Sequence, residues 1–413
     1  MSKLHLTRSD QLYAEARELI PGGMLGIRRP YNFVPGEYPI FLERAQAGLI
    51  WDVDGNRYVD MLAAYGPIIL GHREKEIDDA VAAQMEKGFC MNLVQPVQNE
   101  LAKTLIRLIP CAEKVVMVKT GSDATTCAVR IARGYTGRLK ILRCGYHGWH
   151  DWCVEVRGGV PQKLWEDTHE FEYNDLDGVD RLLDQHRGNV AAIIVTPVGH
   201  ALGHPVQAPK PGFLEGLRER ATAHGIVLVF DEIRSGFRVA LGGAQRRYGV
   251  TPDVATFGKA MANGYAISAV VGKAEIMDVV DGKVFISSTF FPNSLEMVAA
   301  LKTIEILERE KALDTLWARG EKWLAQARGI VERSGVPAEL SGIPPMPFIT
   351  FPADAEKKYK ERRTCFYTEV IRRGVFLQPF HHGYIMCRHT DADLAQAAQA
   401  IEDALKIVAR EVA

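Results

Sequence analysis

This 413-residue chain has no excess of positive or negative charge. Its 50 Lys and Arg residues nearly balance 51 Asp and Glu residues, which gives a net charge of −1. Nothing in this composition attracts nucleic acid or an anionic membrane surface. Long hydrophobic runs are also lacking, because no stretch approaches the roughly 18 apolar residues of a membrane-spanning helix. We therefore expect small molecules or a second subunit as partners, and neither nucleic acid nor a membrane.

Cysteine is scarce and unpatterned. The seven cysteines form no CxxC pair and show no metal-ligand spacing, so we expect no metal site. They are predicted to be buried thiols in a reducing compartment. The first ten residues lack the long apolar region of a secretory signal, and the expected location is therefore the cytoplasm.

What the chain does contain is an alternation of strand and helix patterns. Short apolar runs typical of strands buried on both faces occur at residues 115–118, 140–142, 192–195, 227–230 and 267–271. Apolar residues at helical spacing occur at residues 77–85, 101–108, 124–132 and 213–224. This alternation predicts an α/β fold with a mostly parallel central sheet flanked by helices.

The two ends of the chain show other patterns. Asp54-Gly55 separates two strand-like runs and predicts a hairpin over residues 49–60. A long charged helical segment follows Leu295, and helix, strand and helix patterns restart after about Gly320. We expect an N-terminal segment over residues 1–64, a large domain over 65–310 and a C-terminal domain over 311–413. The two terminal parts are expected to form one smaller α+β domain.

Asp231 and Lys259 are the most informative pair of polar residues. Asp231 ends an apolar run, and Lys259 follows the next expected strand, so both can reach one ligand at the carboxyl edge of a parallel sheet. Pyridoxal phosphate needs both groups: a lysine for its aldehyde and a carboxylate for its pyridine nitrogen. Taken singly, an Asp at a strand end is more often a turn or helix-cap residue, and a single Lys is far more often a solvated surface charge.

Residues 119–125 follow a strand pattern and open a helix. The expected free amides of Gly121, Ser122 and Asp123, the Ser122 hydroxyl and the helix dipole suit a phosphate group. An ordinary Ser/Asp helix cap is the alternative.

An aromatic and histidine cluster, residues 144–152, follows another strand pattern. Tyr146, between small residues, can lie flat on a planar cofactor. His147 and His150 alone are a weak zinc signal, and core packing is the alternative for Trp149 and Trp152.

Residues 120–124, 145–148, 230–238 and 257–259 together resemble the successive signatures of class III pyridoxal-phosphate aminotransferases. The sequence resembles in particular the glutamate-1-semialdehyde 2,1-aminomutase branch, also through residues 21–23, 51–56, 66–72 and 132–138. The resemblance extends in collinear order over about residues 10–310. It implies a fold type I homodimer with active sites shared between subunits.

The resemblance also implies roles for individual residues. Lys259 would form the Schiff base and act as general acid and base, and Asp231 would pair with the pyridinium. Further cofactor contacts would be Gly121, Ser122, Asp123, Tyr146, His147, Ile233 and, from the neighbouring subunit, Thr289. The implied reaction is a ping-pong transfer of an amino group between a donor and a carbonyl acceptor through pyridoxamine phosphate. Intramolecular transfer in an aminomutase is the alternative, followed by a racemase, a lyase or a non-catalytic protein of the same fold.

Several substrate-facing positions depart from the aminomutase pattern. Thr196 replaces a glutamate, Tyr65 a tryptophan and Arg388 an alanine, and changes also occur at Ala266 and residues 292–294. These departures leave the substrate open.

Candidate substrate contacts remain at four positions. Arg29 matches the arginine that binds a substrate carboxylate in the aminomutase. Because Arg28 precedes it, an ordinary surface arginine is an equally good interpretation of this position. Tyr65, His381 and Arg388, together with His382, are candidate polar contacts. Surface positions in the small domain are the alternative for the last three.

Overall fold

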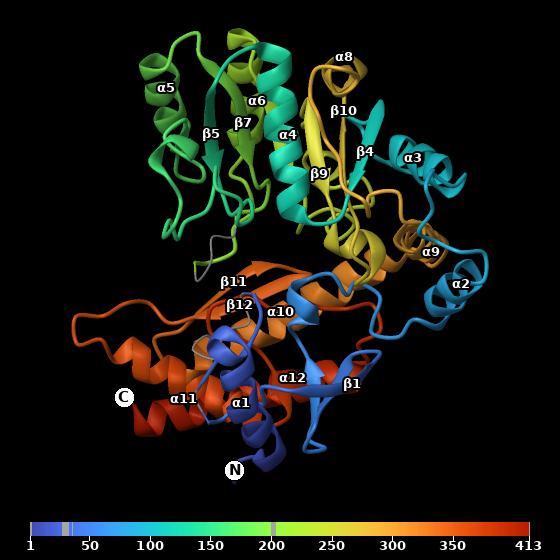
Figure 1. Ribbon diagram of the computed structural model, residues 1–413. Coiled ribbons are helices and arrows are strands. Elements are labelled where there is room, and N and C mark those ends of the chain that lie inside the picture. Colours follow the sequence, from blue (N-terminus) through green and yellow to red (C-terminus); the bar gives the residue numbers. More distant parts are fainter. Residues whose placement is uncertain (1, 27–32, 35, 200–203, 413) are drawn as a thin grey trace. The chain divides into compact units, whose positions relative to one another are not determined.

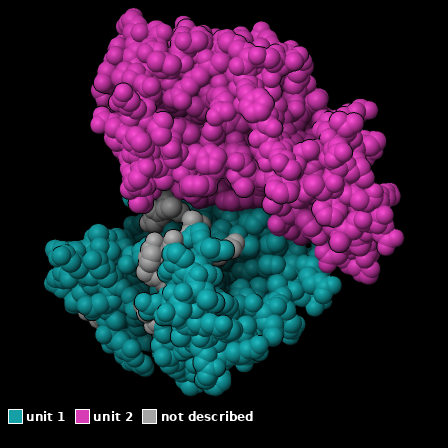
Figure 2. All heavy atoms as spheres, in the orientation of Figure 1, with its two compact units in different colours: residues 1–74, 202–206, 314–413 teal, residues 75–201, 207–313 magenta. Residues whose placement is uncertain are grey.

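The computed structural model describes residues 2–26, 33–34, 36–199 and 204–412. The chain forms two compact units, coloured separately in Figure 2. Unit 1 combines residues 1–74, 202–206 and 314–413, and unit 2 combines residues 75–201 and 207–313. The proposed domain boundaries at residues 64 and 310 stay a prediction.

Unit 2 contains a seven-stranded sheet (Figure 1). Its strands, in spatial order, are β4 (Lys114–Val118), β10 (Ser268–Gly272), β9 (Val254–Phe257), β8 (Val227–Asp231), β7 (Val190–Val195), β5 (Lys140–Cys144) and β6 (Thr168–Glu170). β10 is antiparallel to both neighbours, and every other pair of adjacent strands is parallel. The residues of β7, β8, β9 and β10 are all buried, which accounts for their apolar character.

Helices cover the faces and one edge of this sheet. α4 (Gly121–Thr136) crosses the near face in Figure 1 and contacts β4, β7, β8, β9 and β10. The apolar side chains of α4 that sequence periodicity placed on one face, Ala124, Cys127, Ala128, Ile131 and Ala132, are all buried. The other helices of unit 2 are α2 (Lys75–Met85), α3 (Val97–Leu108), η4 (Gln162–Leu164), α5 (Leu176–Gln185), α6 (Phe213–His224), α7 (Ala244–Tyr248), η5 (Lys259–Ala262), α8 (Ala274–Met277), η6 (Asp278–Val280) and α9 (Leu295–Arg309).

Unit 1 joins segments from both ends of the chain. The expected hairpin is confirmed as β2 (Leu49–Asp52) and β3 (Arg57–Asp60), and β1 (Leu42–Gln46) and β13 (Val375–Phe376) complete a four-stranded sheet. A second sheet contains β11 (Glu339–Ile343) and β12 (Met346–Thr350). The helices are α1 (Thr7–Leu19), η1 (Pro21–Gly23), η3 (Ala63–Tyr65), α10 (Ala312–Ser334), α11 (Lys358–Arg372) and α12 (Asp391–Glu411).

The predicted α/β class with a mostly parallel sheet is confirmed. Two expectations about side chains are wrong, because Cys90 is exposed and Cys365 is only partly buried, whereas the other five free thiols are buried. In the part of the chain that the structure describes, no helix is both long and apolar enough to cross a membrane.

Candidate active site

Four parallel strands of unit 2 end beside one another and place their following residues at one edge of the sheet. β5 leads into residues 145–148, β7 into Thr196, β8 ends at Asp231, and β9 leads into Lys259. The register aligns Cys144 with Val195 and Val195 with Phe230. Polar residues that are distant in sequence are therefore brought together by the strand order.

Asp231 is a buried carboxylate held by three donors. The backbone N–H of Ile233 donates to Oδ1 at 3.1 Å, and the Thr256 hydroxyl donates to Oδ1 at 3.2 Å. His147 Nδ1 lies 2.7 Å from Oδ2. With Nδ1 protonated, His147 donates to this carboxylate. The three contacts fix the orientation of the Asp231 carboxylate at the sheet edge, where the partner of a pyridinium must lie.

Lys259 follows the extended residue Gly258 and opens η5. Its φ of 45° lies in the left-handed region, which is strained for a residue with a side chain. Burial is the largest cause that lowers the pKa of the Lys259 amine well below its ordinary value, and the guanidinium of Arg234 adds to the effect. Asp231 acts in the opposite direction but does not compensate. The amine is therefore neutral, and nucleophilic, at a pH where a surface lysine is charged.

The N-terminus of α4 forms a cradle suited to an anion. Thr120 and Asp123 form a capping box, in which the Asp123 carboxylate accepts from the Thr120 backbone N–H and hydroxyl at 2.8 Å. The Asp123 N–H donates to the Thr120 hydroxyl, so the expectation of a free amide at Asp123 is wrong. The amides of Gly121 and Ser122 lie in the first turn, where a helix offers no carbonyl partner. Together with the Ser122 hydroxyl they provide three donors for a phosphate.

Glycines keep this cradle open. A Cβ on Gly121 would lie 3.0 Å from Ile233 Cγ2, and one on Gly148 would lie 2.3 Å from the Ser122 hydroxyl. Gly148 also has a φ of 113°, which disfavours any other residue. A Cβ on Gly258 would approach Ile233 Cδ1 to 3.2 Å, so Ile233 packs between the cradle and the segment that carries Lys259. The site therefore fits pyridoxal phosphate. It offers hydrogen-bond donors at an anion-binding turn, the Asp231 carboxylate and the Lys259 amine.

Two residues at this edge were not singled out from sequence as site residues. Arg234 is 6% exposed, and its guanidinium carbon lies 5.5 Å from the centre of the Tyr146 ring. An arginine three residues after a strand end is usually solvated, so its burial had no sequence signal. Arg238 is wholly buried in the same segment.

The sequence marks Thr196 only as a departure from the aminomutase pattern. Its hydroxyl and His147 Nε2 are both buried, and neither has a hydrogen-bond partner among the described residues. A Cβ atom added to Gly145 would lie 2.2 Å from the Thr196 hydroxyl and 3.5 Å from His147 Cε1. The Thr196 hydroxyl and the His147 ring therefore both lie next to Gly145. Two unsatisfied polar atoms beside one another indicate a place for a ligand atom or a water molecule.

Three further expectations concern Thr289, Trp149 and Trp152. Thr289 is exposed in the segment between η6 and α9, and its assignment to a neighbouring subunit stays a prediction. Core packing is confirmed for Trp152, which is 7% exposed, and wrong for Trp149, which is 69% exposed. Among the described residues, no group of three or more His, Cys, Asp or Glu side chains could hold a metal ion.

The expected substrate contacts belong to unit 1 or lie outside the described residues, as Arg29 does. Tyr65 and His381 are buried, with ring centres 5.1 Å apart and an edge-to-face arrangement. His381 also stacks on His382 at 4.4 Å. A surface position is therefore wrong for both histidines, whereas a role in substrate binding stays a prediction.

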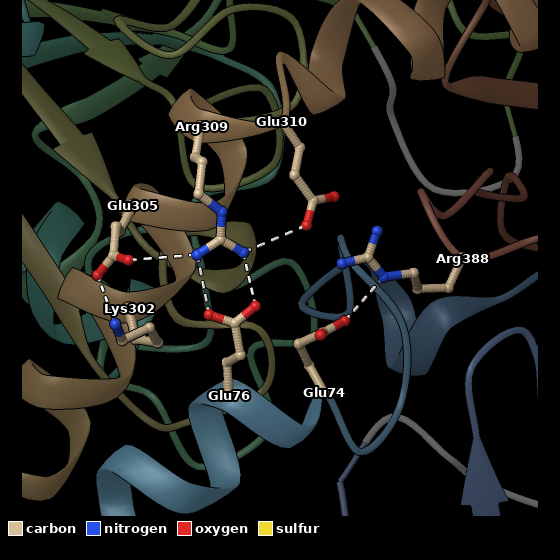
Figure 3. A network of polar contacts seen from close by, with 7 residues as sticks. All are labelled: Glu74, Glu76, Lys302, Glu305, Arg309, Glu310 and Arg388. Carbon is tan, nitrogen blue, oxygen red and sulfur yellow. Dashed lines mark hydrogen bonds and ion pairs between the residues drawn. The ribbon is translucent and has the colours of Figure 1, made fainter.

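Arg388 lies in an ion pair within unit 1. Its Nε donates to Glu74 at 2.8 Å, as Figure 3 shows. An anionic substrate would have to compete with this carboxylate. In unit 2, the same figure shows Arg309 held by Glu76 through two hydrogen bonds of 2.9 and 2.6 Å, which tie α9 to α2.

Comparison with known proteins gives concordant matches. The family described as aminotransferase class III matches residues 33–405. The 3-aminobutyryl-CoA aminotransferase of Cloacimonas acidaminovorans is 60% identical over 404 residues, which cover 98% of each chain. Glutamate-1-semialdehyde 2,1-aminomutase 1 of Lachnoclostridium phytofermentans is 34% identical, covering 98% of this chain and all of that protein.

A solved structure matches almost the whole fold. The FumI protein of Sphingopyxis sp. MTA144, in a form that contains pyridoxal phosphate, is 31% identical with a TM-score of 0.94. The match covers 98% of this chain and 97% of the other.

Proposed function

The chain belongs to the class III aminotransferases, and we propose that its amino donor is a 3-aminoacyl thioester of coenzyme A. The enzyme uses pyridoxal phosphate and moves an amino group between a donor and a carbonyl acceptor. The observation that carries the proposed substrate class is the 60% identity to 3-aminobutyryl-CoA aminotransferase over nearly the full length of both chains. The donor would become the corresponding 3-oxoacyl thioester.

The chemistry of Thr196 is compatible with this substrate class. The C1 carbon of a thioester does not carry the charge of a carboxylate. A site that binds a thioester therefore needs neutral hydrogen-bonding groups near C1 more than it needs another charged side chain. Thr196 presents a buried neutral hydroxyl where the aminomutase pattern has a glutamate. A buried carboxylate at this point would carry a large desolvation cost without a cationic partner.

We assign the proton transfers to Lys259. Bound pyridoxal phosphate supplies the aldehyde carbon that takes up the amino group and a ring that accepts the electron pair of the broken C–H bond. Because burial and Arg234 keep its pKa low, the Lys259 amine takes the proton from C3 of the donor and returns a proton in the second half of the cycle. Asp231, supported by His147 and Thr256, holds the proton on the ring nitrogen.

The remaining contacts position the cofactor. Gly121 and Ser122 would bind its phosphate at the start of α4, where the helix dipole favours an anion. Tyr146 would cover one face of the ring, and Ile233 the other.

We also propose a homodimer whose partner subunit completes each site. Two loops support this proposal: residues 88–95 and 281–294 meet where the Ser294 N–H donates to the Phe89 carbonyl at 3.2 Å. They expose large apolar side chains, among them Leu93 at 81%, Phe285 at 80% and Phe290 at 58%. Such exposure of apolar surface is typical of a protein interface. Thr289 lies within this surface.

A donor panel tests the substrate class. Purified enzyme with pyridoxal phosphate is given 3-aminobutyryl-CoA, free 3-aminobutyrate or a 2-amino acid, each with a panel of 2-oxo acids as acceptors. We expect kcat/KM for the thioester to exceed that for the free acid by at least about a hundredfold, since the site would use the acyl-CoA group for binding. Equal rates with the free acid would contradict the proposal.

The same assay separates the alternative reactions. An aminomutase would turn over its substrate without any added acceptor, and a racemase would change only the configuration of the donor. We expect neither product when the acceptor is left out, and a single half-reaction that stops after one equivalent per site.

A further inference from the structure

A cavity of about 460 Å³ lies beside α4 in unit 2, and the chemistry described above does not use it. Its volume is within the range of about 300–1,000 Å³ that is typical of small-molecule sites. Thr126, Arg130 and Arg133 line it from one face of α4, since residues at this spacing are neighbours on a helix. Trp149 and His150, from the segment after β5, line it as well. The cavity therefore combines cationic and aromatic side chains.

The two guanidiniums in this cavity are held by uncharged groups. Arg130 Nη1 donates to the Phe285 carbonyl at 3.0 Å, and Arg133 Nε donates to the Leu139 carbonyl at 2.8 Å. A guanidinium has five N–H donors, so these contacts leave others for a ligand. Among the described lining residues, Asp151 is the only carboxylate beside the two cations. The lining has an excess of positive charge and suits an anion.

Trp149 gives the cavity an exposed aromatic ring. It is 69% exposed, and its ring centre lies 5.3 Å from that of His150 in an edge-to-face arrangement. Trp152 Nε1 donates to the Thr126 hydroxyl at 2.8 Å, and that hydroxyl lies 2.8 Å from His150 Nδ1. With the hydroxyl donating to Nδ1, His150 Nε2 carries the ring proton and is a further donor. These groups suit a ligand that has both a flat ring and negative charge.

The cavity adjoins the phosphate cradle at the start of α4. The Trp149 N–H donates to the Ser122 hydroxyl at 3.3 Å, which leaves the proton of that hydroxyl for the cofactor phosphate. A helix rises about 1.5 Å per residue, so Arg130 lies about 12 Å further along α4 than Ser122. In an acyl-CoA, a long flexible pantetheine chain separates the nucleotide from the thioester. A nucleotide pocket at some distance from the cofactor suits such a donor.

We propose that this cavity binds the adenosine 3′,5′-bisphosphate end of an acyl-CoA donor. The adenine would stack on Trp149, and the phosphates would accept hydrogen bonds from Arg130, Arg133 and His150. The inference rests on the proposed thioester donor for the identity of the nucleotide. It explains how the enzyme would distinguish an acyl-CoA from the free acid, because only the thioester can use binding energy from this remote part.

Calorimetric titration of the holoenzyme with adenosine 3′,5′-bisphosphate tests the cavity without turnover. We expect one molecule to bind per chain with a Kd below about 1 mM. Trp149→Ala should weaken binding about tenfold because base stacking is lost. Arg130→Gln should also weaken it about tenfold because charge-assisted hydrogen bonds are lost. Trp149→Phe, which keeps a ring for stacking, should retain most of the affinity.

Two controls separate local from general effects. Arg181→Gln removes an arginine whose side chain is 72% exposed on α5, and its affinity should match that of wild type. Adenosine, which has no phosphate, should bind more weakly than the bisphosphate and should not respond to Arg130→Gln. Light scattering checks that Arg130→Gln keeps the wild-type mass, since Arg130 also contacts the loop that contains Phe285. If the mass changes, the comparison of Trp149→Ala with Trp149→Phe decides.

Two results of the titration would overturn the proposal. One is the absence of binding to wild type, which would also be the result if a partner subunit covered the cavity. The other is equal affinity in wild type and Trp149→Ala.

Kinetics of the loaded enzyme distinguish a failure of this inference from a failure of the proposed donor. In Trp149→Ala, the ratio of kcat/KM for 3-aminobutyryl-CoA to that for free 3-aminobutyrate should fall about tenfold, mainly through the KM for the thioester. Arg181→Gln should keep the wild-type ratio. An unchanged ratio in Trp149→Ala would overturn the nucleotide site and leave the donor proposal standing. A wild type that does not prefer the thioester would contradict the donor proposal and with it the acyl-CoA origin of the nucleotide, whereas the titration would still decide whether the cavity binds one.

Discussion

Lys259 has an unusual backbone conformation and an unusual pKa. Its backbone is held in a left-handed conformation, and its amine has a pKa well below the ordinary value because of burial and the nearby guanidinium of Arg234. Strain at such a position persists only where the surrounding structure enforces it. At β9 that structure is the buried run Val254–Phe257 followed by the crowded residue Gly258.

We expect Lys259→Ala to remove the visible band of the bound cofactor and to lower kcat by at least about ten-thousandfold, since both covalent attachment and proton transfer are lost. Near-ultraviolet circular dichroism should be unchanged, and Lys103→Ala, which removes an exposed lysine from α3, should retain wild-type activity. Normal turnover by Lys259→Ala would refute its assignment as the proton carrier.

Thr196 should show opposite effects on stability and on activity. Its buried hydroxyl has no partner among the described residues, so Thr196→Val should stabilise the cofactor-free protein by about 1 kcal/mol in urea unfolding. If a ligand atom or water bound beside His147 uses the hydroxyl, kcat/KM should fall about tenfold in the same variant. Thr196→Ser should retain activity. Destabilisation of the cofactor-free protein by valine would show that the hydroxyl has a structural partner.

At the scale of elements, the N-terminus of α4 depends on its capping box. Thr120→Ala should cost about 1 kcal/mol of stability and weaken the binding of pyridoxal phosphate, because the first turn positions the amides of Gly121 and Ser122. The chain offers a matched control in α12, where Thr390 and Asp393 form the same capping box in unit 1. Thr390→Ala should cost similar stability and leave cofactor affinity unchanged in a fluorescence titration. Equal affinities in both variants would contradict the role of α4.

Glu232 makes the turn after β8 sensitive to pH. It accepts hydrogen bonds from the Ser235 hydroxyl and the Ala244 N–H, both at 2.7 Å, yet burial raises its pKa to about 7. The folded protein therefore binds a proton that the unfolded chain releases near pH 4.5. The resulting stabilisation is fully present below that pH and is lost as the pH rises through 7, with an upper limit of about 3 kcal/mol.

The comparison of wild type with Glu232→Gln isolates this group. Urea unfolding at pH 5 and pH 8 should show a larger loss of stability for wild type than for the glutamine variant, which cannot titrate. A parallel pH dependence in both proteins would mean that Glu232 has no raised pKa in the folded state.

Sequence patterns predicted the strands that are buried on both faces. They did not predict the direction of individual strands or the elements that form only through tertiary contacts. The apolar runs at β5, β7, β8 and β10 were visible because strands inside the sheet have no solvent face. The run at β4 was also visible, but β4 is an edge strand whose residues are mostly only partly buried, so the expectation of burial on both faces is wrong there. β9 was expected as the strand before Lys259 but was not identified as an apolar run, and nothing local to β10 encodes that it is antiparallel to both neighbours. β13, two residues long, exists because it pairs with β3 across more than three hundred residues.

The residues of the candidate site were also predictable from the sequence only in part. Asp231, Lys259 and the turn at Gly121 follow strand ends, so their proximity followed from the predicted sheet. The burial of Arg234 depends on how the turn after β8 folds back. The isolation of the Thr196 hydroxyl depends on Gly145 and His147, which follow another strand, β5. Neither property has a periodic signal in the sequence.

At the scale of the whole molecule, the exposed loops at residues 88–95 and 281–294 are the strongest argument for a second subunit. We expect light scattering after gel filtration to give twice the chain mass of 45.9 kDa at micromolar concentration. A change of Phe285 to Asp, which places a charge in this apolar surface, should shift the protein toward the monomer. A stable monomer in wild type would contradict the shared site.

Subunit mixing tests whether Thr289 acts across the interface. Lys259→Ala should be inactive, and Thr289→Asp should bind the cofactor poorly because it would place a carboxylate beside the phosphate. When the two are unfolded together and refolded, each mixed dimer would contain one site with both changes and one site with neither. Since random pairing makes half of the dimers mixed, activity should recover to about a quarter of wild type. If Thr289 instead serves its own subunit, both sites of the mixed dimer carry a defect, and the mixture should remain as inactive as its components.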